Sequence, residues 1–91
     1  MSRHEVEVSG EVTALTFPAA GTNPVLRASL DLDPGQIELV FVGHTYLPGL
    51  HVGRRMRARG RIFVNGSHYQ MFNPMYWLKA EDYDAAPSSG R

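Results

Sequence analysis

The chain of 91 residues contains no cysteine, which excludes disulfides, thiol nucleophiles and thiolate metal sites. Its apolar runs extend over only a few residues, far below the roughly 20 that a transmembrane helix needs. The first residues run directly into alternating acidic positions without the apolar segment of a signal peptide. We therefore expect a soluble, cytoplasmic protein without a membrane partner.

The remaining side chains form no catalytic or metal-binding motif. The four histidines, His4, His44, His51 and His68, lack the spacing of zinc ligands. No serine lies in the Gly-x-Ser-x-Gly turn of hydrolases, and no glycine-rich segment joins a strand to a helix as phosphate-binding loops do. We therefore expect neither an enzyme nor a bound cofactor or metal.

Positive charge is concentrated in one short segment. The chain has nine cationic and nine acidic residues and a net charge of zero, which by itself argues against a nucleic-acid partner. Five of the cations, however, are arginines between residues 54 and 61, where there is no acid. Because arginine suits bidentate phosphate contacts and stacking on bases, this segment is the first candidate for a binding site.

Alternation of apolar and polar residues with a period of two indicates strands with one buried face. It is clearest in residues 5–14, where valines at positions 6, 8 and 12 alternate with glutamates at 5, 7 and 11. Similar patterns predict strands over residues 25–32, 37–42, 55–64 and 67–72. Segments rich in glycine or proline predict the loops and turns at 17–24, 33–35 and 43–53. Five strand segments without a helix, in a length that suits one domain, predict an all-β barrel or sandwich.

Asn65-Gly66 is a strong signal for a two-residue hairpin turn and predicts the register of the last two strands. The inner face then pairs Val64 with Ser67, Ile62 with Tyr69, and Gly60 with Met71, and places Tyr69 in the core. The outer face pairs Phe63 with His68, Arg61 with Gln70, and Arg59 with Phe72. Guanidinium groups and aromatic rings would alternate on this outer face.

The arginines at alternate positions, Arg55, Arg57, Arg59 and Arg61, are expected on one face of a strand. They would be about 6.7 Å apart, because a strand rises about 3.3 Å per residue, and this is close to the phosphate spacing of an extended nucleic-acid strand. Aromatic neighbours would stack on bases. The alternative is internal pairing, in which glutamates 5, 7 and 11 on the first strand neutralise the arginines across the sheet. Five arginines face only three glutamates, so some positive charge should survive.

Short motifs in the second half of the chain resemble a known family. They are Leu39-Val40-Phe41-Val42-Gly43, Leu47-Pro48-Gly49-Leu50, the arginine-rich segment from Gly53 to Gly60, and the ending Asn73-Pro74-Met75-Tyr76. With these motifs the segment 38–78 resembles small bacterial OB-fold nucleic-acid-binding proteins and is similar to the OB wedge domain of RecG-type helicases. The resemblance implies a five-stranded OB-fold, a Greek-key β-barrel with a short non-strand insertion between strands 3 and 4.

The resemblance also implies a binding surface. In OB-folds the ligand usually lies on the outer face of strands two and three. By that likeness Arg27 and Ser29, together with Val40 and Val42, face the ligand, and His44 and Tyr46 lie at its rim. This surface differs from the arginine-rich strand, and the sequence does not decide between the two.

We predict an OB-fold domain over residues 1–79, followed by a flexible tail over residues 80–91. The expected function is non-catalytic binding of single-stranded or partly unwound nucleic acid, DNA favoured over RNA, with low sequence specificity. The candidate binding residues are Arg27, Tyr46, Arg54, Arg55, Arg57, Arg59, Arg61, Phe63, His68 and Phe72. The alternative is a protein-interaction module in which an exposed hydrophobic edge docks a partner protein.

Overall fold

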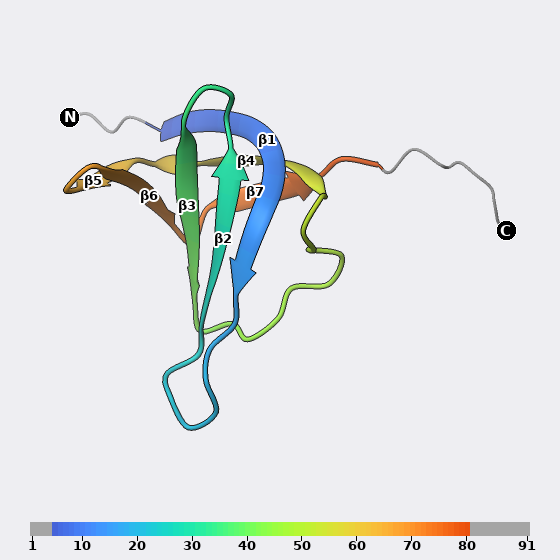
Figure 1. The fold of residues 1–91 in the computed structure, drawn as a ribbon, viewed down its shortest axis with the longest axis vertical. Coiled ribbons are helices and arrows are strands. Elements are labelled where there is room, and N and C mark those ends of the chain that lie inside the picture. The colour runs from blue at the N-terminus through green and yellow to red at the C-terminus, as the bar shows by residue number, and fades with distance from the viewer. Residues whose placement is uncertain (1–4, 81–91) are drawn as a thin grey trace, which may run out of the picture.

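The computed structural model describes residues 5–80, which form one curled β-sheet (Figure 1). Its strands are β1 (Glu5–Thr16), β2 (Val25–Asp31), β3 (Gln36–Val42), β4 (Arg55–Arg61), β5 (Phe63–Asn65), β6 (His68–Phe72) and β7 (Met75–Leu78). No helix occurs between residues 5 and 80. The predicted all-β class is therefore confirmed. The predicted tail lies outside the described residues except for Ala80.

The sheet is mixed and its hydrogen-bonded order is β5-β6-β3-β2-β1-β4-β7. All neighbours are antiparallel except β3 and β6, which are parallel. The sheet has seven strands rather than the five expected and is not closed by hydrogen bonds. The extra strands arise because Ile62 separates β4 from β5 and because the chain after Pro74 forms β7. The sheet nevertheless curls enough to bring β4 into contact with β6.

The long first strand holds the two halves of the sheet together. Residues 5–11 of β1 pair with β4, and residues 11–16 pair with β2. Between them β1 curves strongly, as Figure 1 shows, and its register with β2 shifts between Val12 and Ala14. Gly10 lies at this bend, where the Asp31 carbonyl group of β2 approaches its Cα. A bend of this kind needs a residue without a side chain at the point of closest approach.

The core lies inside the curl of the sheet. Each of the four long strands contributes its alternate apolar residues, as the period-two pattern predicts. The largest side chains that are fully buried there include Leu26, Leu30, Ile37, Leu39 and Met71. Leu47 and Leu50 from the 43–54 loop also enter the core, so the predicted non-strand segment between β3 and β4 covers apolar surface. Burial of such side chains contributes about 1.5–3 kcal/mol each.

The hairpin register differs from the prediction. Asn65 pairs with His68, Val64 with Tyr69 and Phe63 with Gln70, so the turn consists of Gly66 and Ser67 rather than Asn65 and Gly66. Gly66 has a φ of 64° and takes the first central position, where a type II′ turn requires glycine. Because the turn moves by one residue, the pairing moves by two. Every side chain therefore keeps its predicted side of the sheet.

The prediction that Tyr69 belongs to the core is wrong. Tyr69 points to the same side as Met71, but the tip of the β5–β6 hairpin extends beyond the core (Figure 1), and Tyr69 is 53% exposed. Gly60 and Met71 are not paired by hydrogen bonds, yet a Cβ atom on Gly60 would lie 3.7 Å from the Met71 sulfur. The predicted packing of Met71 against a residue without a side chain is thus retained.

The bend in β1 generates a test of stability. A Cβ atom at Gly10 would overlap the Asp31 carbonyl oxygen, a backbone atom that cannot rotate away. We expect Gly10→Ala to lower the free energy of unfolding by about 3 kcal/mol, the upper end of the usual cost of overpacking. Gly60→Ala is the matched control, because its nearest neighbours would lie at 3.6 Å. Urea denaturation measures both, and equal midpoints for the two variants would contradict this account of the bend.

Candidate nucleic-acid interface

The arginine row lies on the outer face of β4. Arg55, Arg57, Arg59 and Arg61 are exposed and alternate with the buried Met56 and Ala58. Glutamates of β1 face them, because Glu5, Glu7 and Glu11 are the register partners of Arg61, Arg59 and Arg55. The period-two pattern predicted this face correctly. Whether the row is available to a ligand depends on which arginines the glutamates neutralise.

Within residues 5–80, two of the four arginines of the row are paired and two are not. Arg57 Nε lies 3.3 Å from a Glu7 carboxylate oxygen, and Arg59 Nε lies 3.4 Å from one of Glu5. Among residues 5–80, neither Arg55 nor Arg61 makes an ion pair. The internal pairing that the sequence left open therefore occurs at the centre of the row. The positive charges of Arg55 and Arg61 at its two ends are not balanced by a carboxylate of the described residues.

Aromatic rings continue the row beyond Arg61. The Arg61 guanidinium carbon lies 5.6 Å from the centre of the Phe63 ring, and that ring meets Phe72 edge to face at 5.7 Å. Phe63 and Phe72 are 45% and 46% exposed. The predicted pairing of Arg59 with Phe72 does not form, and the contacts on this face run instead from Arg61 through Phe63 to Phe72. We call these three residues the outer strip.

The surface implied by the OB-fold resemblance adjoins the outer strip. Val40 of β3 pairs with Phe72 on one side and with Arg27 on the other, so the two predicted surfaces are continuous. The expectation that Val40 faces a ligand is wrong, because its neighbours leave it 1% exposed. Arg27 lies 3.6 Å from a Glu38 carboxylate oxygen, which also accepts a hydrogen bond of 2.7 Å from Gln70. The charge of Arg27 is therefore largely balanced.

Three other predicted residues lie apart from the outer strip. Arg54 donates hydrogen bonds to the carbonyl oxygens of Gly49 and Lys79 and thereby ties the 43–54 loop to the end of β7. Tyr46 is exposed in that loop, and His68 is exposed at the hairpin tip opposite Asn65. Within the described part of the chain, neither ring contacts the outer strip.

Sequence reasoning missed the contribution of β7. Trp77 pairs with Arg57 across the sheet, and the guanidinium carbon of Arg57 lies 4.8 Å from the centre of the Trp77 ring. The bend at Pro74 concealed this, because it interrupts the period-two pattern on which the prediction of faces relied. Read from Met75 onward, alternation places Met75, Trp77 and Lys79 on one side. That signal was available only once β7 was known to be a strand.

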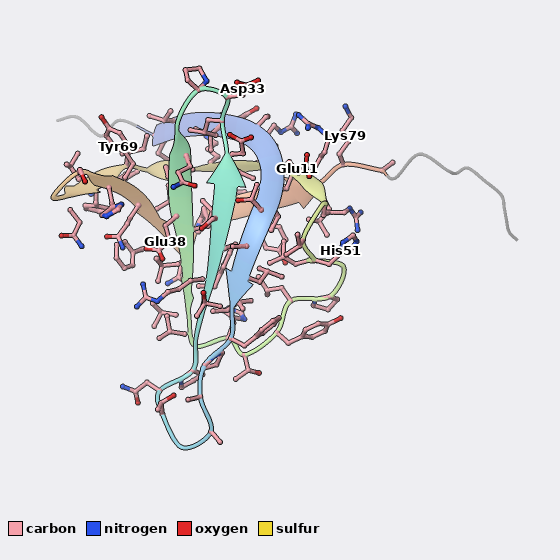
Figure 2. The ribbon with its side chains drawn as sticks, viewed as in Figure 1. Glu11, Asp33, Glu38, His51, Tyr69 and Lys79 are labelled. Atoms are coloured by element: carbon pink, nitrogen blue, oxygen red, sulfur yellow. The ribbon has the colours of Figure 1, made fainter. Side chains whose placement is uncertain are left out.

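A cleft of about 700 Å³ opens between the β2–β3 turn and the β5–β6 hairpin. Its lining is mainly uncharged and includes Gln36, Gln70 and Tyr69, with Glu38 at the side of β3. Figure 2 shows Tyr69 on the β5–β6 hairpin and Glu38 on β3. Amide groups beside an exposed phenol ring suit a neutral, hydrogen-bonding ring better than a phosphate, which needs cations.

No membrane-spanning helix and no metal-binding cluster are found in the described residues. None of the elements between residues 5 and 80 is a helix long and apolar enough to span a bilayer. No group of three histidine, aspartate or glutamate side chains within that range is arranged to hold a metal ion. No protein-family model matches the chain, and no curated protein matches its sequence.

The division of the row into paired and unpaired arginines is measurable by double-mutant cycles. We expect the Glu7–Arg57 pair to show a coupling energy of about 0.2–1 kcal/mol, as exposed ion pairs do. The matched cycle on Glu11 and Arg55 should show no measurable coupling. Alanine substitutions and urea denaturation supply both values. Equal coupling in the two cycles would show that Glu11 neutralises Arg55 and that the row has one free cation fewer.

Proposed function

We propose that this protein binds single-stranded or partly unwound nucleic acid without catalysing a reaction and with little sequence preference. The observation that carries the proposal is the outer strip, where the unpaired guanidinium of Arg61 lies over Phe63 and Phe63 contacts Phe72. A cation beside exposed aromatic rings offers a phosphate contact and a stacking surface within the length of one nucleotide unit. Base–aromatic stacking contributes about 1–3 kcal/mol per base and tolerates any sequence.

The arginine row extends this surface along β4. Arg55 and Arg61 keep their charge, and the ion pairs of Arg57 and Arg59 involve side chains that are half exposed. Exposed pairs contribute less than about 1 kcal/mol, so a phosphate can compete with the glutamates for both guanidinium groups. The row thus provides two free cations and two exchangeable ones. The cleft beside Tyr69 is open to a base from the same strand.

We also propose that the fold is an OB-type barrel, as the sequence motifs imply. Three features support this assignment. The order β1-β2-β3 continues in a parallel β3–β6 pair, β1 also pairs with β4, and a non-strand loop connects β3 to β4. Only Ile62 separates β4 from β5, so these two strands act as one bent strand that reaches β6. On this basis β7 is an addition to a five-stranded Greek key. We further propose that the partner is DNA and that the protein is cytoplasmic.

Salt dependence and charge reversal test the proposal together. Affinity for a fluorescent oligothymidylate should fall with salt, with a log–log slope of about −1.4 if two phosphates are neutralised. The Arg55→Glu, Arg61→Glu double variant should bind at least about 100-fold more weakly, because it loses two charge-assisted contacts. Fluorescence anisotropy measures both effects. Unchanged affinity in the double variant would refute a site on β4.

A comparison of two single variants separates the effect of the position of a charge from the effect of the net charge. Arg61→Gln and Asn23→Glu each lower the net charge by one, but Asn23 is exposed in the loop between β1 and β2 and lies in neither predicted surface. Only the first should weaken binding. If both weaken it alike, the attraction is a property of overall charge rather than of the outer strip.

Release of the paired arginines should have the opposite effect. In the Glu5→Gln, Glu7→Gln variant the carboxylates that hold Arg57 and Arg59 are gone, so both guanidinium groups are free for phosphate. We expect oligothymidylate affinity to rise about fivefold, equivalent to about 1 kcal/mol, in the same anisotropy assay. Asp33→Asn is the control, because Asp33 on the β2–β3 turn pairs with no arginine among the described residues. No gain in the double variant would show that the row does not meet the nucleic acid.

One observation favours the alternative of a protein-interaction module. All three residues of β5 are exposed, among them Phe63 and Val64, and β5 is an edge strand with one unpaired side. An incoming peptide strand can pair with such an edge. Absence of oligonucleotide binding by the unaltered protein even at low salt would favour this function over the first.

A further inference from the structure

The ion pairs between β1 and β4 follow a constant diagonal step. Arg59 lies opposite Glu7 but pairs with Glu5, and Arg57 lies opposite Ser9 but pairs with Glu7. Each arginine therefore reaches the residue two positions before its register partner. The same step from Arg55, which lies opposite Glu11, leads to position 9. A serine occupies that position, so the series ends where the next carboxylate would stand.

A pocket of about 350 Å³ lies at the end of this series, between β1, β4 and β7. Its polar lining comes from Ser9, Arg55, Arg57 and Lys79, and Trp77 forms an aromatic wall. No acidic residue of the described segment lines it. Arg57 is balanced by Glu7 and lies against Trp77, so it contributes to the wall rather than free charge.

The two remaining cations of the pocket are held side by side. The Lys79 backbone N–H donates a hydrogen bond of 2.9 Å to the Arg55 carbonyl oxygen, which aligns the end of β7 with the start of β4. Neither residue makes an ion pair in the part of the chain that the structure describes. Glu11 and Lys79 lie at the same end of the molecule (Figure 2), but Glu11 neither pairs with Arg55 nor enters the pocket.

We infer that this pocket binds a phosphate group, with Arg55 and Lys79 as the cationic ligands and the Ser9 hydroxyl as a hydrogen-bond donor. Guanidinium and ammonium groups form strong charge-assisted hydrogen bonds to phosphate oxygens. The inference rests on the proposed function, since the phosphate is that of a nucleic-acid strand, either a backbone diester or a terminal monoester. The pocket and the outer strip are then two ends of one path along β4, about 20 Å apart.

The inference is tested by placing a carboxylate at position 9, where the series of glutamates ends. Ser9→Glu completes the series and gives Arg55 a partner, so the variant should unfold at the same or a higher urea concentration. It should bind oligothymidylate at least tenfold more weakly. Ser9→Ala retains the free cations and should lose no more than about threefold, and Asn23→Glu adds the same charge on an exposed loop and should change nothing. Lys79→Gln removes a cation at an exposed position and should also weaken binding.

Trp77 provides a direct readout, because it is the single tryptophan of the chain and lines the pocket. Inorganic phosphate, titrated at constant ionic strength, should change its fluorescence in the unaltered protein and not in Ser9→Glu. Oligothymidylates with a 5′-phosphate, a 3′-phosphate or neither identify the source. A preference for one end assigns a terminal monoester, and equal affinity assigns the backbone.

The outcomes separate the pocket from the proposed function. If Ser9→Glu and Lys79→Gln bind oligothymidylate normally while Arg61→Gln does not, the pocket is refuted and nucleic-acid binding stands. If the unaltered protein binds no oligothymidylate but phosphate still changes Trp77 fluorescence in a Ser9-dependent manner, the pocket stands and the proposed function falls. If the unaltered protein binds no oligothymidylate and phosphate does not change Trp77 fluorescence, the pocket and the proposed function are both refuted.

Discussion

The antiparallel pairing of β1 with β4 is the interaction on which the other features of the molecule depend. One side of β1 supplies core residues such as Val12, while its other side presents the glutamates that meet the arginine row. Slippage by one residue would turn both sets of side chains over. The same ladder therefore determines what is buried, which arginines are neutralised and where charge is left for a ligand. Core and candidate site cannot be altered independently along this strand.

Much of the fold was predictable because a strand leaves a period-two record in its sequence. Residues 5–14 and 55–61 show the pattern clearly, and both the arginine face and the buried side of β4 follow from it. The hairpin register was not predictable. Asn65-Gly66 and Gly66-Ser67 are both suitable turns, and the choice depends on packing of the flanking strands. Tyr69 was misplaced for a related reason, since alternation reports a side of the sheet but not where the core ends.

The candidate site was predictable in composition and only partly in arrangement. The sequence identified Arg55, Arg61, Phe63 and Phe72, but it could not tell which arginines the glutamates would take. That depends on a diagonal offset between side chains. The alternation of residues predicts which face a side chain is on, but not which neighbour on that face it pairs with. Trp77 and Lys79 could not be assigned to a face from the sequence, because the proline before β7 interrupts the alternation. Arg54 was assigned to the ligand, whereas its hydrogen bonds serve the loop before β4.

The two strands at the ends of the sheet are short. β5 spans three residues and β7 spans four, so each offers an incoming chain only a few backbone donors and acceptors. Short margins of this kind limit indiscriminate strand-to-strand adhesion. They also mean that main-chain pairing alone cannot hold a partner firmly. Any lasting association of this domain, whatever the class of partner, therefore needs side-chain contacts in addition to main-chain pairing.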